Sequence, residues 1–570
     1  MSRFLGLSCA LVLALTALPT TGKGQAQRVQ PIDRLPANTY AVLIWHGQAA
    51  ISKGAATNNL VRLWNDPDFL SVRQIFSQAI AGSGPGASPG SGKGLSKADQ
   101  DAMVDVMASP GVVGAAGALD LGRMFDSASA GAASKDSDIF IIWDAAGKEA
   151  QWRRIDELAQ NPSQPATVTN VKLKGIDVRI SETEKRMAYS GMVGPWRVEA
   201  GRQALFEDLV GRLQSTSAPA TSLVQSPLYT ESQRFRADNT LVEFLVKMPD
   251  TKTIKSTPGE PFNVAAFMQG LHLDRVRGFV GSIGLAGTGT QMRSALVGDT
   301  TVGSLFDLFG ASTTTFGTLP AAPSGYSYSA SKLDFGAFYR TVRAALKGAM
   351  APDQFGNLEM MEGMVAAEMQ MPLADLLGAI EEVASITPAD AVSTDFARVI
   401  FALRLKRTSD FIALFKKSMG EMISAEATEG ATTYLTLTSP VGALHVAAGP
   451  QLLVVAPTRE LARAAMTRAA AAGPQPGSLA ADAGFQKGRA LFPPALTSLA
   501  YSDMTKLPWQ TLFGELTSAV PASATSGPAG DKLAADLVRL LPPLMAKYLK
   551  SSSSAGWKTP AGMFFEGRID

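Results

Sequence analysis

The residues with the most suggestive chemistry in this 570-residue chain are Ser329 and Lys332, which form the pattern S-x-x-K in the segment SASK. In penicillin-recognising enzymes a serine and a lysine at this spacing belong to the catalytic site, together with the elements S-D-N and K-T-G. Here the corresponding segments read SDM at 502–504 and KTP at 558–560, so each lacks one residue. The pattern therefore favours a chain without enzymatic activity. A serine-type acyl-transferring or peptidoglycan-active envelope enzyme using Ser329 and Lys332 is the alternative.

A second segment, GASPGSGKG at 86–94, is similar to a phosphate-binding loop. The loop pattern G-x-x-x-x-G-K-[ST] needs a glycine where Ala87 stands and a hydroxyl where Gly94 stands. We therefore interpret residues 82–94 as a flexible insertion rich in Gly, Ser and Pro. The sequence predicts no cofactor.

The three histidines, His46, His272 and His445, are candidate metal ligands. A zinc site needs three or four converging ligands. Only Asp274 stands near one of these histidines at a suitable spacing, two residues after His272. The sequence predicts three structural histidines and no metal site.

Methionines are concentrated between residues 357 and 380. They are Met360, Met361, Met364, Met369 and Met371. Thioethers can form an adaptable binding surface or bind a soft metal such as copper. Packing in the core is the favoured interpretation, and a concealed ligand site is the alternative.

The acidic segment DPDF at 66–69 could be part of a catalytic site or the start of a helix. It is similar to SPLY at 226–229 and DAGF at 482–485, and in each an Asp or Ser precedes an aromatic residue by three positions. Asp and Ser cap free backbone N–H groups, and proline suits the first helical position. We predict three helix starts.

Residues 1–26 are typical of a signal peptide. Arg3 precedes an uncharged apolar run at 5–18, and small residues allow cleavage after Ala26. The only cysteine, Cys9, would be removed with this segment. We expect a periplasmic or extracellular protein that has no transmembrane segment after cleavage.

The charges are balanced, with 52 basic and 50 acidic side chains and a net charge of +2. They are interspersed along the chain, and nucleic-acid-binding surfaces need clustered basic residues. The composition therefore excludes nucleic acid as the expected partner. An unknown ligand or an envelope protein is expected instead.

Two long segments repeat at a nearly constant offset. Residues 194–213 match 449–469 at an offset of 255, and 222–248 match 478–504 at 256. The pairs 138–158 with 399–419, aligned at Phe140 and Phe401, and 35–47 with 319–331 match more loosely. Such self-similarity is the sequence signature of a duplicated unit.

Each copy reads as alternating strands and helices. The segment TLVEFLVKM at 240–248 predicts a strand, in which Val242, Phe244 and Val246 alternate with a wetter face of Glu243, Leu245 and Lys247. The predicted fold is α+β, with two similar copies of largely antiparallel sheets and helices packed on one face.

The predicted domain organisation contains four parts. They are a signal peptide at 1–26, a first α+β unit at 27–302 with the flexible insertion at 82–94, a linker at 303–324, and a second unit at 325–570.

Several segments together suggest a family. LPANTYAVLIWHG, NNLVRLWNDPDF, DIFIIWDAAGKEAQWRRI, GPWRVEAGRQALFEDLV and SLVQSPLYTESQRF resemble a group of large exported bacterial proteins, frequent in Acidobacteria-like envelopes, that share a domain of unknown function. The resemblance implies an envelope location and a repeated α+β architecture. It implies no activity and no site residues.

The sequence as a whole predicts an exported, non-catalytic binding or envelope-associated module made of two similar halves. The cleft or interface between the halves is the expected working surface.

Overall fold

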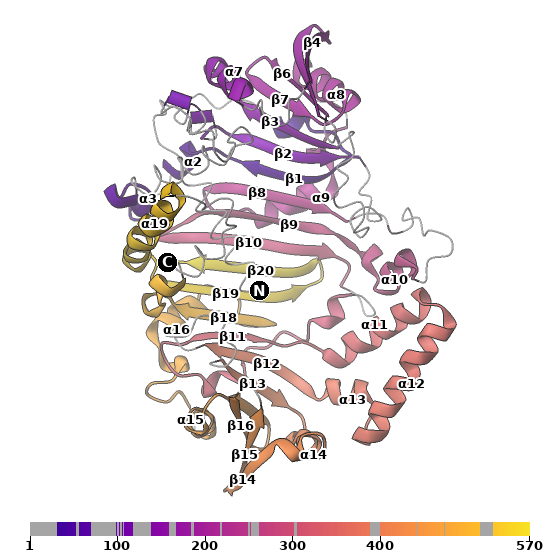
Figure 1. Cartoon of the computed structure of the whole chain (residues 1–570), viewed down its shortest axis with the longest axis vertical. Coiled ribbons are helices and arrows are strands. Elements are labelled where there is room, and N and C mark those ends of the chain that lie inside the picture. The colour runs from indigo at the N-terminus through magenta and orange to yellow at the C-terminus, as the bar shows by residue number, and fades with distance from the viewer. Residues whose placement is uncertain are drawn as a thin grey trace. The chain divides into compact units, whose positions relative to one another are not determined.

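The chain forms two compact units in the computed structural model (Figure 1). Unit 1 takes its residues from 1–249, 277–294 and 509–548, and unit 2 from 250–276, 295–508 and 549–570. The structure describes residues 31–52, 56–69, 98–99, 102, 105–106, 108–117, 138–158, 167–183, 187–216, 219, 221–248, 251, 262–300, 305–387, 399–439, 442–471, 473–512 and 528–570. The predicted signal peptide and the insertion at 82–94 lie outside these residues.

Unit 1 is built on an antiparallel sheet. Its strands are β1 (Thr39–Trp45), β2 (Gly111–Ala116), β3 (Ile139–Asp144), β4 (Thr167–Leu173), β5 (Ile176–Glu182), β6 (Met187–Val193), β7 (Trp196–Ala200), β8 (Thr240–Lys247) and β9 (Val276–Ala286), which β10 (Gly289–Gly298) follows. Hydrogen-bonded neighbours run in the order β4-β5-β6-β7-β3-β2-β1-β8-β9. Every one of these pairings is antiparallel, as predicted.

The helices of unit 1 occupy the connections between these strands, except for the last, which comes from residues 528–548 near the end of the chain. They are α2 (Ala49–Ser52), α3 (Asn59–Trp64), α7 (Glu149–Leu158), α8 (Gln203–Gln214), α9 (Pro227–Ser232) and α19 (Pro528–Tyr548), with short 3-10 turns at Pro31–Arg34, Leu223–Gln225 and Gln233–Phe235. In α8, the buried residues Leu205, Phe206, Leu209 and Val210 recur at the helical period and form one packing face. The ring of Phe206 lies 6.4 Å from that of Tyr189 in β6, so this face covers the sheet.

Unit 2 is also built on antiparallel strands. Its strands are β11 (Ser327–Ser331), β12 (Ile380–Thr387), β13 (Ile400–Leu405), β14 (Ile423–Glu429), β15 (Thr432–Ser439), β16 (Gly442–Ala448), β17 (Leu452–Ala456), β18 (Ser498–Asp503), β19 (Ser551–Thr559) and β20 (Gly562–Ile569). They pair in the order β14-β15-β16-β17-β13-β12-β11-β18-β19-β20.

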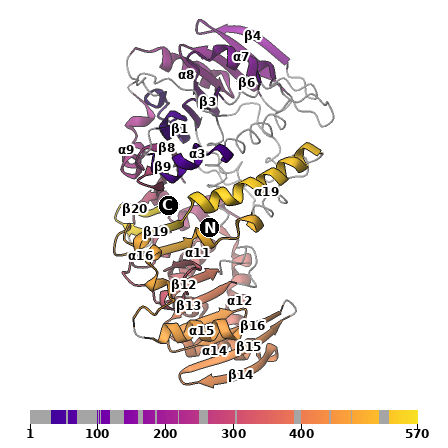
Figure 2. The same ribbon diagram turned by 90° about the vertical axis from the view of Figure 1, so that its left-hand side faces the viewer.

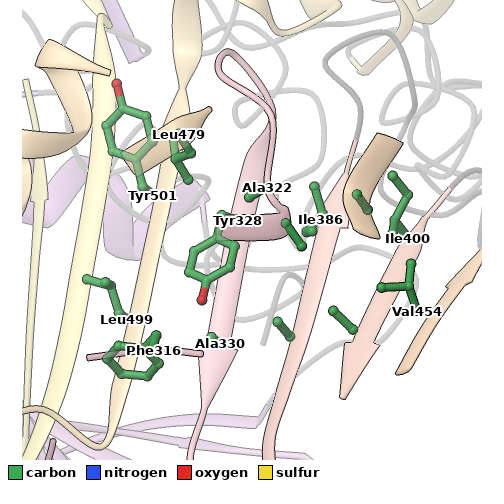
Figure 3. Close-up of a cluster of buried hydrophobic side chains, with 14 of the residues drawn as sticks. Phe316, Ala322, Tyr328, Ala330, Ile386, Ile400, Val454, Leu479, Leu499 and Tyr501 are labelled. Carbon is green, nitrogen blue, oxygen red and sulfur yellow. The ribbon is translucent and has the colours of Figure 1, made fainter. Parts of the chain in front are cut away.

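Helices in unit 2 lie on both faces of the sheet, whereas the sequence predicted one. They are α10 (Val264–Gly270), α11 (Phe335–Ala349), α12 (Pro352–Met369), α13 (Leu373–Gly378), α14 (Thr408–Ser418), α15 (Arg459–Ala470) and α16 (Ala483–Arg489), with 3-10 turns at Leu273–Arg275, Leu305–Leu308, Leu319–Ala321, Gly420–Met422, Leu479–Ala481 and Met504–Lys506. Helices α15 and α16 pack on the face that carries Tyr328, Ala402 and Val454. Figure 3 shows Tyr328 and Val454 in this core. Helices α13 and α14 pack on the face that carries Leu403 and Leu453.

The reason for two helical layers is that β13 and β17 are apolar on both sides. In β13, Ile400 and Ala402 point to one core, and Leu403 and Leu405 belong to the other. A strand that is buried on both faces has a continuous run of apolar residues in its sequence. The apolar runs of β13 and β17 are short, which favours a buried strand over a helix.

Part of the predicted linker lies within unit 2. Phe306 and Phe316 are buried, and Phe316 belongs to the same core as Tyr328. Thr313 also pairs with Leu496 through two backbone hydrogen bonds of 2.8 Å.

Within the described part of the chain, no helix combines the length and apolar character needed to cross a bilayer.

The three predicted helix starts are confirmed. Ser226 accepts a hydrogen bond from the N–H of Tyr229 at 3.2 Å, and Asp482 accepts one from Phe485 at 2.9 Å. Asp66 accepts one from the N–H of Asp68 at 2.9 Å, and residues 67–69 are helical.

Asp66 also makes long-range contacts that the sequence did not indicate. Its Oδ2 atom accepts hydrogen bonds from Lys547 Nζ and from the Tyr548 hydroxyl, both at 2.7 Å, at the end of α19. Helices α3 and α19 lie side by side (Figure 2), and the guanidinium of Arg62, in α3, lies 5.5 Å from the centre of the Tyr548 ring. Burial acts to raise the pKa of Asp66, but these hydrogen bonds outweigh it and hold the pKa below its ordinary value. The buried carboxylate therefore attaches α19 to α3 within unit 1.

Replacing Asp66 with Asn should lower the free energy of unfolding by about 2 kcal/mol at neutral pH, because a charged acceptor of three hydrogen bonds is lost. The contribution of a carboxylate with a lowered pKa is present above its unfolded pKa and is lost as the pH falls through the folded one. Urea unfolding of the parent and D66N should therefore converge below about pH 3. The exposed neighbour provides the control, since D68N should change stability by less than about 0.5 kcal/mol. Equal losses for both variants would contradict the assignment.

Candidate functional site

Ser329 and Lys332 lie in and just after strand β11. Successive side chains on a strand point to opposite faces, so residues three apart point in opposite directions. The neighbouring Ser327 shares a hydrogen bond of 2.5 Å with Ser502 of the SDM segment, in the adjacent strand β18. The strand geometry therefore supplies a row of hydroxyl groups here and does not direct Lys332 towards Ser329.

The three histidines have different surroundings. His46 Nε2 contacts Glu243 Oε1 at 2.6 Å, and His445 Nδ1 contacts Thr436 Oγ1 at 3.2 Å. His272 adopts a left-handed backbone conformation, with φ of 55°, at the end of α10. Among the described residues, no three His, Cys, Asp or Glu side chains are grouped so that they could hold a metal ion.

The most perturbed charged cluster of unit 1 surrounds Glu243, in β8. Its Oε1 atom accepts from His46 at 2.6 Å and from Arg236 Nη2 at 2.7 Å, and its side chain is only 9% exposed. Burial acts to raise the pKa of Glu243, but the hydrogen bond and charge of His46, followed by Arg236, outweigh it and hold the pKa below the ordinary value. Nearby, burial and the charge of Glu243 raise the pKa of Tyr229 to about 12.

This cluster borders a cavity that is too small for a substrate. The cavity is lined by Tyr229, Ser232, Ser282 and the Glu243 cluster, and its volume is about 10 Å³. A single buried water needs roughly that much space. Ser232 Oγ donates to the backbone oxygen of Tyr229 at 2.6 Å, and Ser282 Oγ donates to that of Phe235 at 2.6 Å. The hydroxyls and the carboxylate are thus engaged within the fold.

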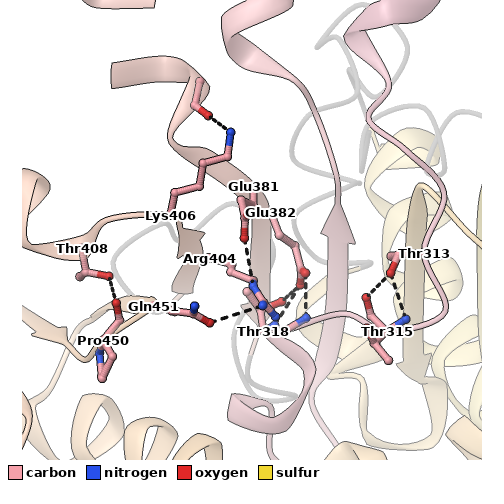
Figure 4. A network of polar contacts seen from close by, with 12 residues as sticks. Thr313, Thr315, Thr318, Glu381, Glu382, Arg404, Lys406, Thr408, Pro450 and Gln451 are labelled. Carbon is pink, nitrogen blue, oxygen red and sulfur yellow. Dashed lines mark hydrogen bonds and ion pairs between the residues drawn. The ribbon is translucent and has the colours of Figure 1, made fainter. Parts of the chain in front are cut away.

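A buried carboxylate in unit 2 has a comparable structural role (Figure 4). Glu382, in β12, is fully buried and accepts hydrogen bonds from the N–H groups of Gly317 at 2.8 Å and Thr318 at 3.0 Å. The Thr318 hydroxyl contacts both Glu382 and the Tyr328 hydroxyl, the latter at 3.0 Å. Glu382 therefore fixes the segment that precedes β11. Burial, with the charge of Glu382, raises the pKa of Tyr328 well above its ordinary value.

Burial of Glu243 contradicts part of the prediction for β8. The sequence predicted that the Glu243 side would be the wetter face, but Glu243 and Leu245 are buried and Val246 is 38% exposed, whereas Val242 is buried and Lys247 is exposed as predicted. The error arose because charge was read as exposure, and the contacts of His46 and Arg236 make the burial of this carboxylate tolerable.

On the side of these strands opposite Glu243, unit 1 carries two rows of mainly apolar residues. One row of paired residues is Ile141, Val113, Leu43, Phe244 and Gly281, and the next is Ile139, Ala115, Ala41, Val246 and Phe279. We call these ten residues the apolar face. Directly paired residues of an antiparallel sheet project to the same side. Together they cover strands β3, β2, β1, β8 and β9.

Several side chains of the apolar face are strongly exposed. Ile139 is 52% exposed and Val113 is 36% exposed, while Leu43, Ile141, Phe244 and Phe279 are half-buried, and Ala115 and Gly281 are buried between them. The rings of Phe244 and Phe279 lie 5.2 Å apart and form an aromatic pair. Single exposed apolar residues are ordinary, but a contiguous exposed patch is typical of a binding surface. The apolar face is therefore the candidate functional site.

A corresponding surface on unit 2 is hydroxylated. Its first row is Phe401, Ser385, Ser329, Ala500 and Ser554, and its second is Thr387, Ser327, Ser502 and Ser552. We call these nine residues the hydroxyl face.

The methionines of 357–380 also differ from their prediction. Met369 and Met371 pack against the core that contains Leu405 and Phe411, as expected. Core packing is wrong for Met360, Met361 and Met364, which are exposed on α12. This helix is apolar on two sides, which explains why its sequence shows no clean apolar stripe.

No family model matches the chain, and no curated protein or solved structure matches it.

Replacing Glu243 with Gln should lower the stability of unit 1 by about 2 kcal/mol at pH 7, because His46 and Arg236 then lose the buried carboxylate that they contact. The contribution of Glu243 is present above its ordinary pKa of 4.5 and is lost as the pH falls through the lowered folded value. Denaturant unfolding should thus separate parent and E243Q at pH 7 and bring them together in acid. A double-mutant cycle with H46Q should show a coupling energy above about 0.5 kcal/mol. Additive losses would contradict a direct His46–Glu243 interaction.

Proposed function

We propose that the protein is an exported, non-catalytic binding module that holds an apolar ligand or partner surface on the apolar face of unit 1. The observation that carries this proposal is the exposure of Ile139, Val113 and Val246 on one side of the neighbouring strands β3, β2, β1 and β8. Water disfavours exposed apolar area by roughly 25 cal/mol per Å², so covering this face would provide binding energy.

The chemistry of the charged clusters supports binding over catalysis. The carboxylates of Glu243 and Glu382 are buried and are occupied by hydrogen bonds from within the fold. A general base needs a free lone pair within reach of a substrate proton. These groups act instead as structural anchors of their sheets.

We also propose that the chain contains two copies of one α+β unit. The strand order of unit 1 becomes that of unit 2 when each strand number is raised by ten. Helix α8 follows β7 as α15 follows β17, and α9 precedes β8 as α16 precedes β18. This agreement across connection types supports duplication more strongly than composition could.

Local contacts repeat as well. Pro36 forms a bridge with Ser222, and Pro323 forms one with Ser478. The N–H of Leu223 donates to Leu35 at 3.0 Å, and that of Leu479 donates to Ala322 at 2.9 Å. These contacts match Pro36 with Pro323. The sequence comparison of 35–47 with 319–331 had instead matched the Leu-Pro pair at 35 with the Leu-Pro pair at 319.

The two sheets differ in chemistry at equivalent positions. Val113 corresponds to Ser385, and Val246 corresponds to Ser502, when the paired strands are matched. Such a difference supports specialisation, in which only unit 1 offers an apolar binding surface. Export itself is proposed from the signal-like residues 1–26.

The variant V113S/V246S/F279S should bind the apolar probe 8-anilinonaphthalene-1-sulfonate at least twofold less than the parent. These substitutions give unit 1 the residues of the hydroxyl face, and serine offers the probe little apolar area. Probe fluorescence should be titrated under conditions where the melting curve shows that both proteins are folded.

The matched control is S385A/S502A, which alters the hydroxyl face and should leave the probe titration unchanged. Equal fluorescence of the parent and V113S/V246S/F279S would place the apolar binding elsewhere and overturn the proposal.

A fluorescent penicillin should leave Ser329 unmodified, because the strand spacing turns Lys332 away from it. Intact-mass spectrometry after an overnight incubation should therefore show the unmodified mass for the parent and for S329A. A covalent adduct on the parent that is absent from S329A would establish the serine-type enzyme instead.

A further inference from the structure

Helix α12 is held to α11 by one of its faces. Phe355 is buried, and the guanidinium of Arg343 lies 5.2 Å from the centre of its ring. Glu362 accepts from Arg343 Nε at 2.7 Å and contacts the Tyr339 hydroxyl. Arg343 also pairs with Glu359 at 2.8 Å. These contacts fix which side of α12 faces unit 2 and which faces solvent.

The opposite side of α12 carries three exposed methionines. Met360, Met361 and Met364 are 60%, 58% and 60% exposed. At about 100° per residue, Met364 lies about 40° from Met360 and about 60° from Met361 around the helix axis. Residues three and four apart on a helix have Cβ atoms about 5–6 Å from each other. The three thioethers thus emerge from one small patch and have no packing role.

The charge around this patch favours a cation. Residues 352–369 read PDQFGNLEMMEGMVAAEM and contain four acidic side chains and no Lys, Arg or His. Helices that lie on anionic membranes carry Lys and Arg beside their apolar residues. Glu359 and Glu362 pair with Arg343, but the helix still has an excess of negative charge, which disfavours a lipid surface and raises the local concentration of cations.

We propose that Met360, Met361 and Met364 form a binding site for a soft monovalent metal ion, Cu(I), through their three Sδ atoms. Neutral thioethers select soft ions, while zinc and other borderline metals prefer imidazole or thiolate. Within 352–369 the sequence offers neither of those ligands. Methionine has three rotatable side-chain bonds, so three sulfurs on adjacent turns can converge on one ion.

Silver(I) is the probe for this site, because it matches the ligand preference of Cu(I) and does not change oxidation state in air. The test uses the full chain with C9S, which removes the only thiol, labelled with ¹³C at the methionine methyl groups. Titration should give one tight Ag(I) site and should move three methyl resonances. The variant M360L/M361L/M364L keeps apolar side chains of similar size, lacks the sulfurs, and should bind Ag(I) at least tenfold more weakly.

Met369 provides the matched control, since it lies on the same helix but packs against the core. M369L should bind Ag(I) as the parent does, and the melting temperatures of all variants should show that they fold. Unchanged binding by M360L/M361L/M364L would overturn the proposal. So would the absence of a tight Ag(I) site in the parent, or movement of methyl resonances other than those of the three exposed methionines.

Discussion

The architecture of unit 1 depends on the neutralisation of one buried carboxylate. Glu243 faces the helix-covered side of the sheet, where His46 and Arg236 satisfy it at 2.6 and 2.7 Å. A one-residue slip in register would move every side chain of β8 to the other face. The contacts of Glu243 therefore favour the register that also points Phe244 and Val246 outward. The apolar face is therefore exposed because the buried carboxylate of Glu243 has its partners on the opposite side of β8.

A different solution holds the equivalent region of unit 2 together. There, Tyr328 and Tyr501 pair directly across β11 and β18, and both are buried. The outward side chains of these strands are small and hydroxylated, and Glu382 anchors the preceding segment through backbone N–H groups. The two units thus share a strand order while their surfaces differ, and the binding that we propose uses the surface whose exposure to water is unfavourable.

Local signals in the sequence were reliable where the physical cause was also local. The caps at Ser226 and Asp482 depend only on the next three residues, and both were predictable. Antiparallel pairing followed from the alternating strands. The attachment of Asp66 to Tyr548 joins residues 482 positions apart, and no pattern in either segment indicates it. The apolar face was missed for the same reason, because the partners that permit Glu243 to be buried come from other segments.

The central claim is that Glu243 fixes β8 with Val246 outward and Leu245 inward, so that an apolar ligand can cover Val246. Cysteine labelling in the C9S background tests it most directly, with V246C and L245C treated with the same maleimide. The account predicts that V246C reacts at least tenfold faster than L245C, and that saturating 8-anilinonaphthalene-1-sulfonate slows the labelling of V246C. Equal rates for the two positions, or a V246C rate that the probe leaves unchanged, would contradict it.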